Sequence, residues 1–106
     1  MLRTTALGIA LAVLAQTAAA EEKVVFITEH GFFPEIVYAD DGDTVTFVNE
    51  GDISHKLHNE EVEWETDTIA VGQSKSVTVW QGMKNRYYSD QEGHDSAVIT
   101  FGAAPS

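Results

Sequence analysis

Cysteine is absent from this sequence of 106 residues. The chain can therefore form no disulfide bond, no thiolate metal site and no redox-active thiol pair. A small domain without disulfides needs another source of stability. We expect that stability to come from a packed β core, with or without a bound metal ion.

Basic residues are scarce, with 6 Lys and Arg against 17 Asp and Glu. Five of the bases and all 17 acids follow residue 20, so the segment 21–106 has a net side-chain charge of −12. A surface this acidic repels nucleic acid and anionic lipid, and we expect neither as a partner. It suits a cation or a basic protein, and it also serves solubility alone.

The longest apolar run, Ala6–Ala15, is too short for a membrane anchor, because a transmembrane helix needs about 20 apolar residues. The run follows a positive start at Arg3 and precedes the small residues Ala18-Ala19-Ala20. This is the pattern of a secretory signal peptide. We predict a signal peptide over 1–20 and one domain over 21–106. The product is then expected in the periplasm or outside the cell, with no membrane span left after cleavage.

A sustained helical period is also missing from 21–106. Short runs rich in β-branched and aromatic residues alternate instead with turns that contain Gly, Asp or Pro. The expected strands are 23–28, 35–39, 44–49, 75–80, 85–88 and 97–101. Residues 30–34 should interrupt the sheet, because Pro34 has no amide to donate. Seven or so short strands of this kind predict an all-β sandwich.

Two polar clusters near predicted strands carry side chains that metals bind. The first is the loop 89–95, whose possible donors are Glu92, His94, Asp95 and, more weakly, Asp90. The second is the run 54–58, which contains His55 and His58. The function depends on whether these clusters meet in space, and we expect that they do.

The chain also resembles the cupredoxins along nearly all of 21–101. In the first half the similar runs are Phe33-Pro34, Gly42-Asp43-Thr44-Val45-Thr46-Phe47-Val48-Asn49 and Ser54-His55. In the second half they are Val71-Gly72-Gln73-Ser74, Gly82, Arg86-Tyr87-Tyr88 and Val98-Ile99-Thr100-Phe101. Amicyanin- and plastocyanin-like members are the most similar, because His55-Lys56-Leu57-His58 resembles the His-Asn-x-His run of amicyanin. The resemblance implies a Greek-key β-sandwich of seven to eight strands, with His55 as the first copper ligand.

The ligand loop departs from the cupredoxin pattern. An amicyanin-like register places the family's Cys, His and Met at Ser89, Glu92 and Asp95. A longer, azurin-like register places them at Ser89, His94 and Val98. Both registers stay open, and both put serine where the family has the cysteine whose thiolate a blue copper site needs. Lys56 also stands where the family often has an Asn that braces the loop.

The remaining donors predict a harder metal site. We expect Cu(II), or another divalent ion such as Zn(II), to bind His55 together with Glu92, Asp95 and His94. Copper would be pale, with weak affinity for Cu(I), in a protein for metal binding or handling. The residues leave open that the acids are solvated and that His55 is hydrogen-bonded to one of them. His58 should point to the opposite face of an extended strand.

Two other functions stay open. One is a metal-free module that binds a basic protein through its acidic surface. The other is electron transfer, the default role in the family, which the missing cysteine opposes. An enzyme is not expected, because Ser89 could pair with His55 or His94 but no motif supplies an oxyanion hole or an ordered third member.

Overall fold

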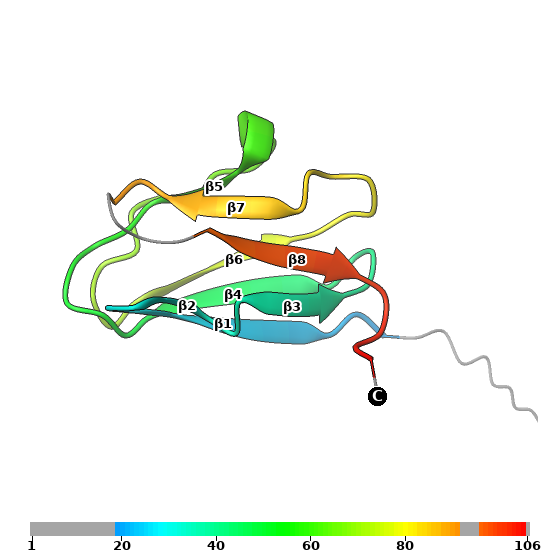
Figure 1. The fold of residues 1–106 in the computed structure, drawn as a ribbon, viewed down its shortest axis with the longest axis horizontal. Coiled ribbons are helices and arrows are strands. Elements are labelled where there is room, and N and C mark those ends of the chain that lie inside the picture. The colour runs from blue at the N-terminus through cyan, green and yellow to red at the C-terminus, as the bar shows by residue number, and fades with distance from the viewer. Residues whose placement is uncertain (1–18, 92–95, 106) are drawn as a thin grey trace, which may run out of the picture.

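The computed structural model describes residues 19–91 and 96–105. Its elements are β1 (Glu22–Thr28), β2 (Gly31–Phe33), β3 (Ile36–Ala39), β4 (Thr44–Asn49), β5 (Leu57–Asn59), the 3-10 turn η1 (Glu60–Val62), β6 (Ser74–Thr78), β7 (Arg86–Ser89) and β8 (Ala97–Phe101). They form two sheets of four strands, in the orders β2-β1-β4-β6 and β3-β8-β7-β5, which face each other as two layers (Figure 1). The predicted Greek-key β-sandwich is confirmed. Within the described residues, no helix is long and apolar enough to cross a membrane.

Each sheet combines parallel and antiparallel pairs. β1 runs parallel to β4, with Glu22 opposite Thr44, and β3 runs parallel to β8. The remaining pairs are antiparallel. Parallel neighbours need a crossover between them, and here the chain makes that crossover by passing through the other sheet. Segments that are far apart in sequence are thereby brought to the same end of the sandwich.

Two strands of three residues differ from the sequence prediction. Residues 30–34 were expected to interrupt the sheet, yet Gly31–Phe33 pairs back on β1 as β2, with Phe26 opposite Phe33. The strand lies at the sheet edge, where the following proline is tolerated. β5 was not predicted as a strand, and it pairs with β7. Both strands are too short to show an alternating pattern, so cross-strand pairing rather than local sequence defines them.

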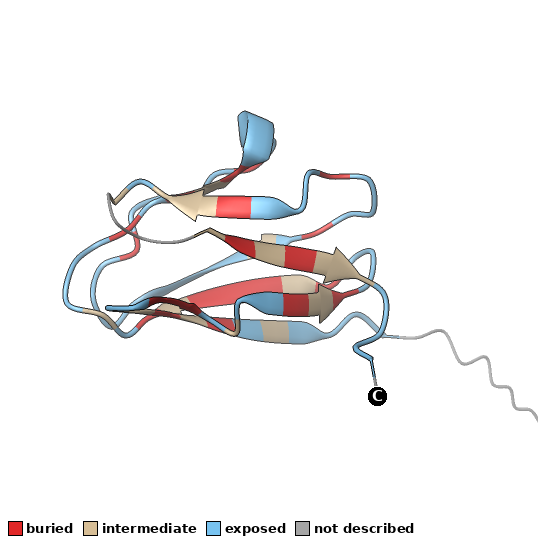
Figure 2. Ribbon diagram, viewed as in Figure 1, coloured by how far each residue is buried: buried red, intermediate tan, exposed pale blue. Residues whose placement is uncertain are grey.

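The core fills the space between the two sheets and is lined by the buried positions of the strands (Figure 2). Aromatic side chains join the layers at its centre. The Phe47 ring lies 5.2 Å from Tyr87 edge-to-face and 5.8 Å from Trp64 in a stacked arrangement. Phe32 meets Tyr87 at 4.9 Å between ring centroids. Such pairs add to the free energy that area burial alone supplies.

We predict that Phe47→Ala lowers the free energy of unfolding by about 3–5 kcal/mol, because it empties the centre of this cluster. Denaturation in urea would measure the loss. Phe33→Ala is the matched control, since Phe33 is 68% exposed, and it should stay within about 0.5 kcal/mol of the parent. Equal losses in the two variants would contradict the central role of Phe47.

Candidate metal site

His55 lies between β4 and β5 and is held by main-chain bonds to a distant segment. Its amide donates to the Ile69 carbonyl at 3.1 Å, and the Ile69 amide donates to the His55 carbonyl at 2.7 Å. Burial alternates from His55 through Asn59, so the imidazole points inward and is only 1% exposed. The backbone therefore fixes a buried imidazole at one end of the sandwich.

The two predicted polar clusters meet at this imidazole. Nδ1 of His55 lies 2.7 Å from Oγ of Ser89, the last residue of β7. The Gln91 amide donates to the same hydroxyl at 3.0 Å. Antiparallel pairing of β5 with β7 sets this contact, because it places Leu57 opposite Ser89. The prediction that the run 54–58 lies beside the start of the loop 89–95 is confirmed for this pair.

A second contact braces the same end of the sandwich. The Lys56 amide donates to Oδ1 of Asp90 at 2.9 Å, and the Asp90 amide donates to the Lys56 carbonyl at 2.9 Å. The cupredoxin resemblance expects an Asn at position 56 to brace the ligand loop. Here the bracing side chain is that of Asp90 in the loop, and Lys56 contributes only its backbone amide and carbonyl. This role of Asp90 was missed, because the sequence suggested only a weak metal donor.

The other predicted ligands lie outside the described residues. Glu92, His94 and Asp95 all fall in the segment 92–95, between the two described parts of the chain. Within the described parts, no group of three His, Asp or Glu side chains gathers in a way that could hold a metal ion. The ligand set therefore stays a prediction, apart from the position of His55.

His58 takes the orientation that its spacing predicts. It lies opposite Tyr88 across β5 and β7, and the two rings stack with centroids 5.7 Å apart. Its Nδ1 lies 3.0 Å from the Asn59 carbonyl. The alternation of burial places it on the outer face of the strand, away from His55. It therefore serves as an internal control for any role of His55.

The Ser89–His55 contact has two chemical interpretations. A nucleophile and base for hydrolysis would need access for a substrate, and His55 is almost fully buried. A metal ligand needs a free lone pair on a ring nitrogen, so an ion bound through Nδ1 would displace the Ser89 hydroxyl from it. Ser89 offers a hydroxyl where a blue copper centre needs a thiolate, so this pair does not fit such a centre.

The core beneath the site holds two polar groups on aromatic side chains. The Tyr87 hydroxyl is buried and has no hydrogen-bond partner among the described residues, and neither has the Trp64 indole nitrogen. Burial raises the pKa of Tyr87 well above its ordinary value, because the phenolate would lose its hydration. Tyr87 is therefore a neutral core residue, as its aromatic contacts also indicate.

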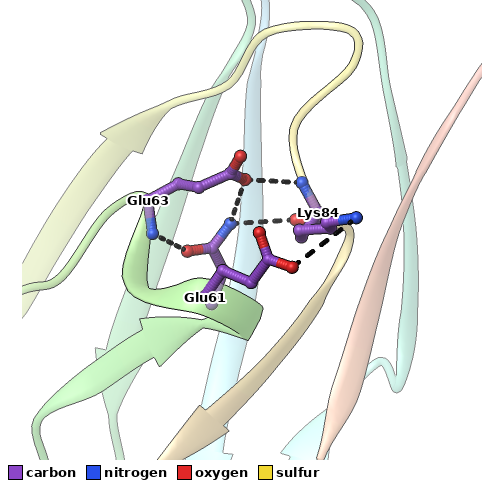
Figure 3. A network of polar contacts seen from close by, with 4 residues as sticks. Glu61, Glu63 and Lys84 are labelled. Atoms are coloured by element: carbon purple, nitrogen blue, oxygen red, sulfur yellow. Dashed lines mark hydrogen bonds and ion pairs between the residues drawn. The ribbon is translucent and has the colours of Figure 1, made fainter.

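An acidic projection, residues 60–65, rises from the other end of β5. Its anchor is Asn59, which is fully buried and accepts bonds from the amides of Glu63 and Trp64 at 2.7 and 3.0 Å. Asn59 also donates to the Glu63 carboxylate and to the Lys84 carbonyl, both at 3.0 Å. Figure 3 shows Glu63 and Lys84 joined through this network. The projection is thus a defined feature of the surface that carries four glutamates.

Comparisons with known proteins show which structures have a similar fold. No protein-family model matches the chain, and no curated protein sequence matches it. Solved structures do match, among them a purple cupredoxin from Nitrosopumilus maritimus, with a TM-score of 0.67 over 76% of this chain and 99% of the other. The fold is cupredoxin-like. This cupredoxin-like chain also matches an oxidised variant of amicyanin, with a TM-score of 0.66 over 76% of this chain and 81% of the other.

A larger protein contains the same fold. A copper-containing nitrite reductase from Thermus scotoductus SA-01 matches 90% of this chain with a TM-score of 0.64, but the match covers only 25% of the reductase. Sequence identities to the three proteins are 14%, 19% and 18%. The likeness is therefore one of fold, and the site must be argued from the residues of this chain.

We predict that Ser89→Ala lowers the free energy of unfolding by about 1–3 kcal/mol, because it leaves the buried imidazole and the Gln91 amide short of one partner. Thermal or urea denaturation would measure the loss. Ser74→Ala is the control, since Ser74 is exposed on the edge strand β6, and it should change stability by less than about 0.5 kcal/mol. A neutral Ser89→Ala would mean that the hydroxyl contributes nothing to holding His55.

Proposed function

We propose that the protein binds copper, or another divalent ion such as zinc, at a non-blue site. The donors are His55 together with Glu92, His94 and Asp95. The observation that supports this most directly is the 2.7 Å contact between His55 Nδ1 and Ser89 Oγ. It joins the two positions that the cupredoxin resemblance assigns to metal ligands. The other three donors rest on the sequence, in which they follow Ser89 within six positions.

The chemistry of this donor set favours storage or delivery of a metal over electron transfer. Imidazole and carboxylate suit Cu(II) in a tetragonal environment and also suit Zn(II). Cu(I) prefers soft sulfur ligands, and this chain offers no thiolate. A site that binds one oxidation state much more tightly than the other carries electrons poorly. We therefore assign the protein to metal binding or handling, without catalysis, and place it in the periplasm on the strength of the signal-like segment 1–20.

We predict that one equivalent of Cu(II) binds with a paramagnetic resonance spectrum of the ordinary, large-hyperfine type and little colour. At a free concentration of one hundred times Kd, binding should raise the free energy of unfolding by about 2.7 kcal/mol. His55→Ala should lose both effects. His58→Ala is the matched control, because it removes an imidazole three positions away on the outer face of the strand, and it should keep both. Equal binding by His55→Ala and the parent would exclude His55 as a ligand.

Ser89→Cys provides a further arm of the same titration. It supplies a thiolate at the position where the cupredoxin resemblance expects one, and a thiolate bound to Cu(II) produces an intense charge-transfer band. The parent should stay pale while this variant becomes strongly coloured. An intense band in the parent would instead favour the electron-transfer role.

A second candidate function rests on the acidic projection. Glu60 and Glu65 are exposed there, Val62 is 56% exposed, and the turn η1 rises above β5 (Figure 1). A rigid, acidic feature with an apolar tip suits a basic protein partner. This function needs no metal, so a failed copper titration would leave it as the leading candidate.

For this candidate we predict that a basic periplasmic protein is retained on the immobilised chain at low salt and released as salt rises, because exposed charges are screened. Glu60→Gln with Glu65→Gln should lose most of the retention. The control is Glu29→Gln with Glu35→Gln, which changes the net charge equally at exposed sites elsewhere. Equal loss in both double variants would show that only net charge matters.

A further inference from the structure

The Asp43 carboxylate lies buried at the opposite end of the sandwich from His55. The residue is only 3% exposed, and the carboxylate forms no ion pair with any described residue. It accepts two backbone bonds, from the Asp40 amide at 2.8 Å and from the Glu21 amide at 2.9 Å. A buried carboxylate is usually paired with a cation. Here the position of a cation is taken by the backbone nitrogen of Glu21.

Glu21 is fixed in that position by the first pairing of β1 with β4. The Thr44 amide donates to the Glu21 carbonyl at 2.9 Å, and Glu22 lies opposite Thr44 in the parallel ladder. Two consecutive residues thus hold Glu21 in place. The Asp43 carboxylate accepts the bond from the Glu21 nitrogen, and the Thr44 amide donates to the Glu21 carbonyl. Asp43 itself cannot shift easily, because its own carbonyl accepts the Val79 amide at 2.9 Å.

The nitrogen that Asp43 holds belongs to the bond that the signal-like pattern marks for cleavage. Ala18 and Ala20 give the small–x–small pattern that precedes such cuts. Ala19, Ala20 and Glu21 are all exposed and lie outside every strand, so a protease can reach them. We propose that a signal peptidase cuts the chain between Ala20 and Glu21 and that Asp43 binds the α-ammonium group that the cut creates.

The step balances as an amide hydrolysis. Water supplies the hydroxyl that leaves Ala20 as a carboxylate, and the Glu21 nitrogen takes up protons to become an ammonium group. That nitrogen keeps its place 2.9 Å from Oδ1 of Asp43, so a bond from a neutral amide to the carboxylate becomes an ion pair between an ammonium group and the carboxylate. A cut one residue earlier would carry the new charge away from the carboxylate, and a cut one residue later would remove the bonded nitrogen.

The charged side chains around Glu21 and Asp43 favour an ammonium group on the Glu21 nitrogen. Glu21, Asp40 and Asp43 all act on Lys23, the one cation that the described residues place there. Lys23 already pairs with the Glu21 side chain at 2.9 Å. Between β6 and β7, the Val79 amide donates to the Asp43 carbonyl and the Gln81 amide donates to Asp41 at 2.9 Å. Among the described residues, no ion pair brings another cationic side chain to Asp43. The cut therefore adds a positive charge where acids predominate.

The pH dependence follows from two groups. The amide of Glu21, followed by that of Asp40, holds the pKa of Asp43 below its ordinary value of 3.8. Its contribution is therefore present above pH 3.8 and is lost as pH falls through the lower folded pKa. A free α-amine has a pKa of about 7.7–8.0, and a neighbouring carboxylate raises it. Its contribution is present below that range and is lost as pH rises through the raised pKa.

The first test is the mass of the protein recovered after export of the full chain from a Gram-negative host. The mass should correspond to a chain that begins at Glu21. A chain that keeps Met1, or one that begins at any other residue, would overturn the proposal.

The second test isolates the charge. All the strands and core residues that the structure describes lie after Glu21, so two forms that begin at Glu21 can be compared, one with a free α-amine and one acetylated on that nitrogen. The acetylated form keeps an N–H for Asp43 and loses only the charge. At pH 6–7 the free amine should raise Tm by roughly 4–8 °C. The difference should vanish above about pH 10, where the amine is neutral.

Asp43→Asn tests whether this carboxylate is the partner of the amine. It should abolish the Tm difference between the free and acetylated forms, even if it lowers Tm in both. Should that variant fail to fold, the pH profile of the unsubstituted pair still decides. Equal Tm values for the free and acetylated forms at every pH would overturn the ion pair. None of these measurements involves a metal, so the result is independent of the proposed copper site.

Discussion

The contact between Phe47 of β4 and Tyr87 of β7 holds the two sheets together in a chain that has no covalent cross-link. Both rings belong to strands, in which residues two positions apart point to the same face of the sheet. The packing of these two rings therefore also sets the orientation of the side chains two positions away. Tyr87 faces the core, and Ser89 then points toward His55. Phe47 faces the core, and Val45 and Asp43 follow the same inward face toward the other end of β4. The position of each functional group is therefore a consequence of core packing.

β4 separates the two ends at which we assign chemistry. Its six residues span about 20 Å, with Asp43 before its first residue and His55 beyond its last. In Figure 1 the start of β1 lies on the right, and the end of β7 lies on the left. A charge at one end is screened from the other by the protein surface and by salt. The proposed cleavage at the N-terminus and the proposed metal binding can therefore be tested separately.

The sequence predicted those parts of the fold whose signal is local. The run Thr44–Asn49 alternates branched and aromatic residues, and it is a strand with the predicted limits. β5 has only three residues, one of them the asparagine that anchors the acidic projection, so nothing local marks it as a strand. Its existence depends on β7, which lies 28 positions or more along the chain.

The candidate site likewise has parts that local sequence predicts and parts that it does not. Local patterns could identify imidazoles and carboxylates, but the pairing of His55 with Ser89 spans 34 positions and was suggested by resemblance to a family. Sequence analysis placed Asp43 in a run that resembles the cupredoxins and gave it no role at the N-terminal segment. Its bond to Glu21 requires the parallel register of β1 on β4, which no local pattern encodes.

Serine at the position of the expected cysteine changes what holds this end of the sandwich. A thiolate ligand would tie the loop to the metal, whereas Ser89 hydrogen-bonds the imidazole and the Gln91 amide directly. The Asp90 carboxylate and the Lys56 amide add a second connection that also needs no ion. The His55 end is thus secured by the protein's own hydrogen bonds, and gain or loss of an ion need not disturb the fold. An ion that binds through Nδ1 must compete with one hydrogen bond, which lowers its affinity. Exchange of this kind agrees with the proposed role in metal uptake and release.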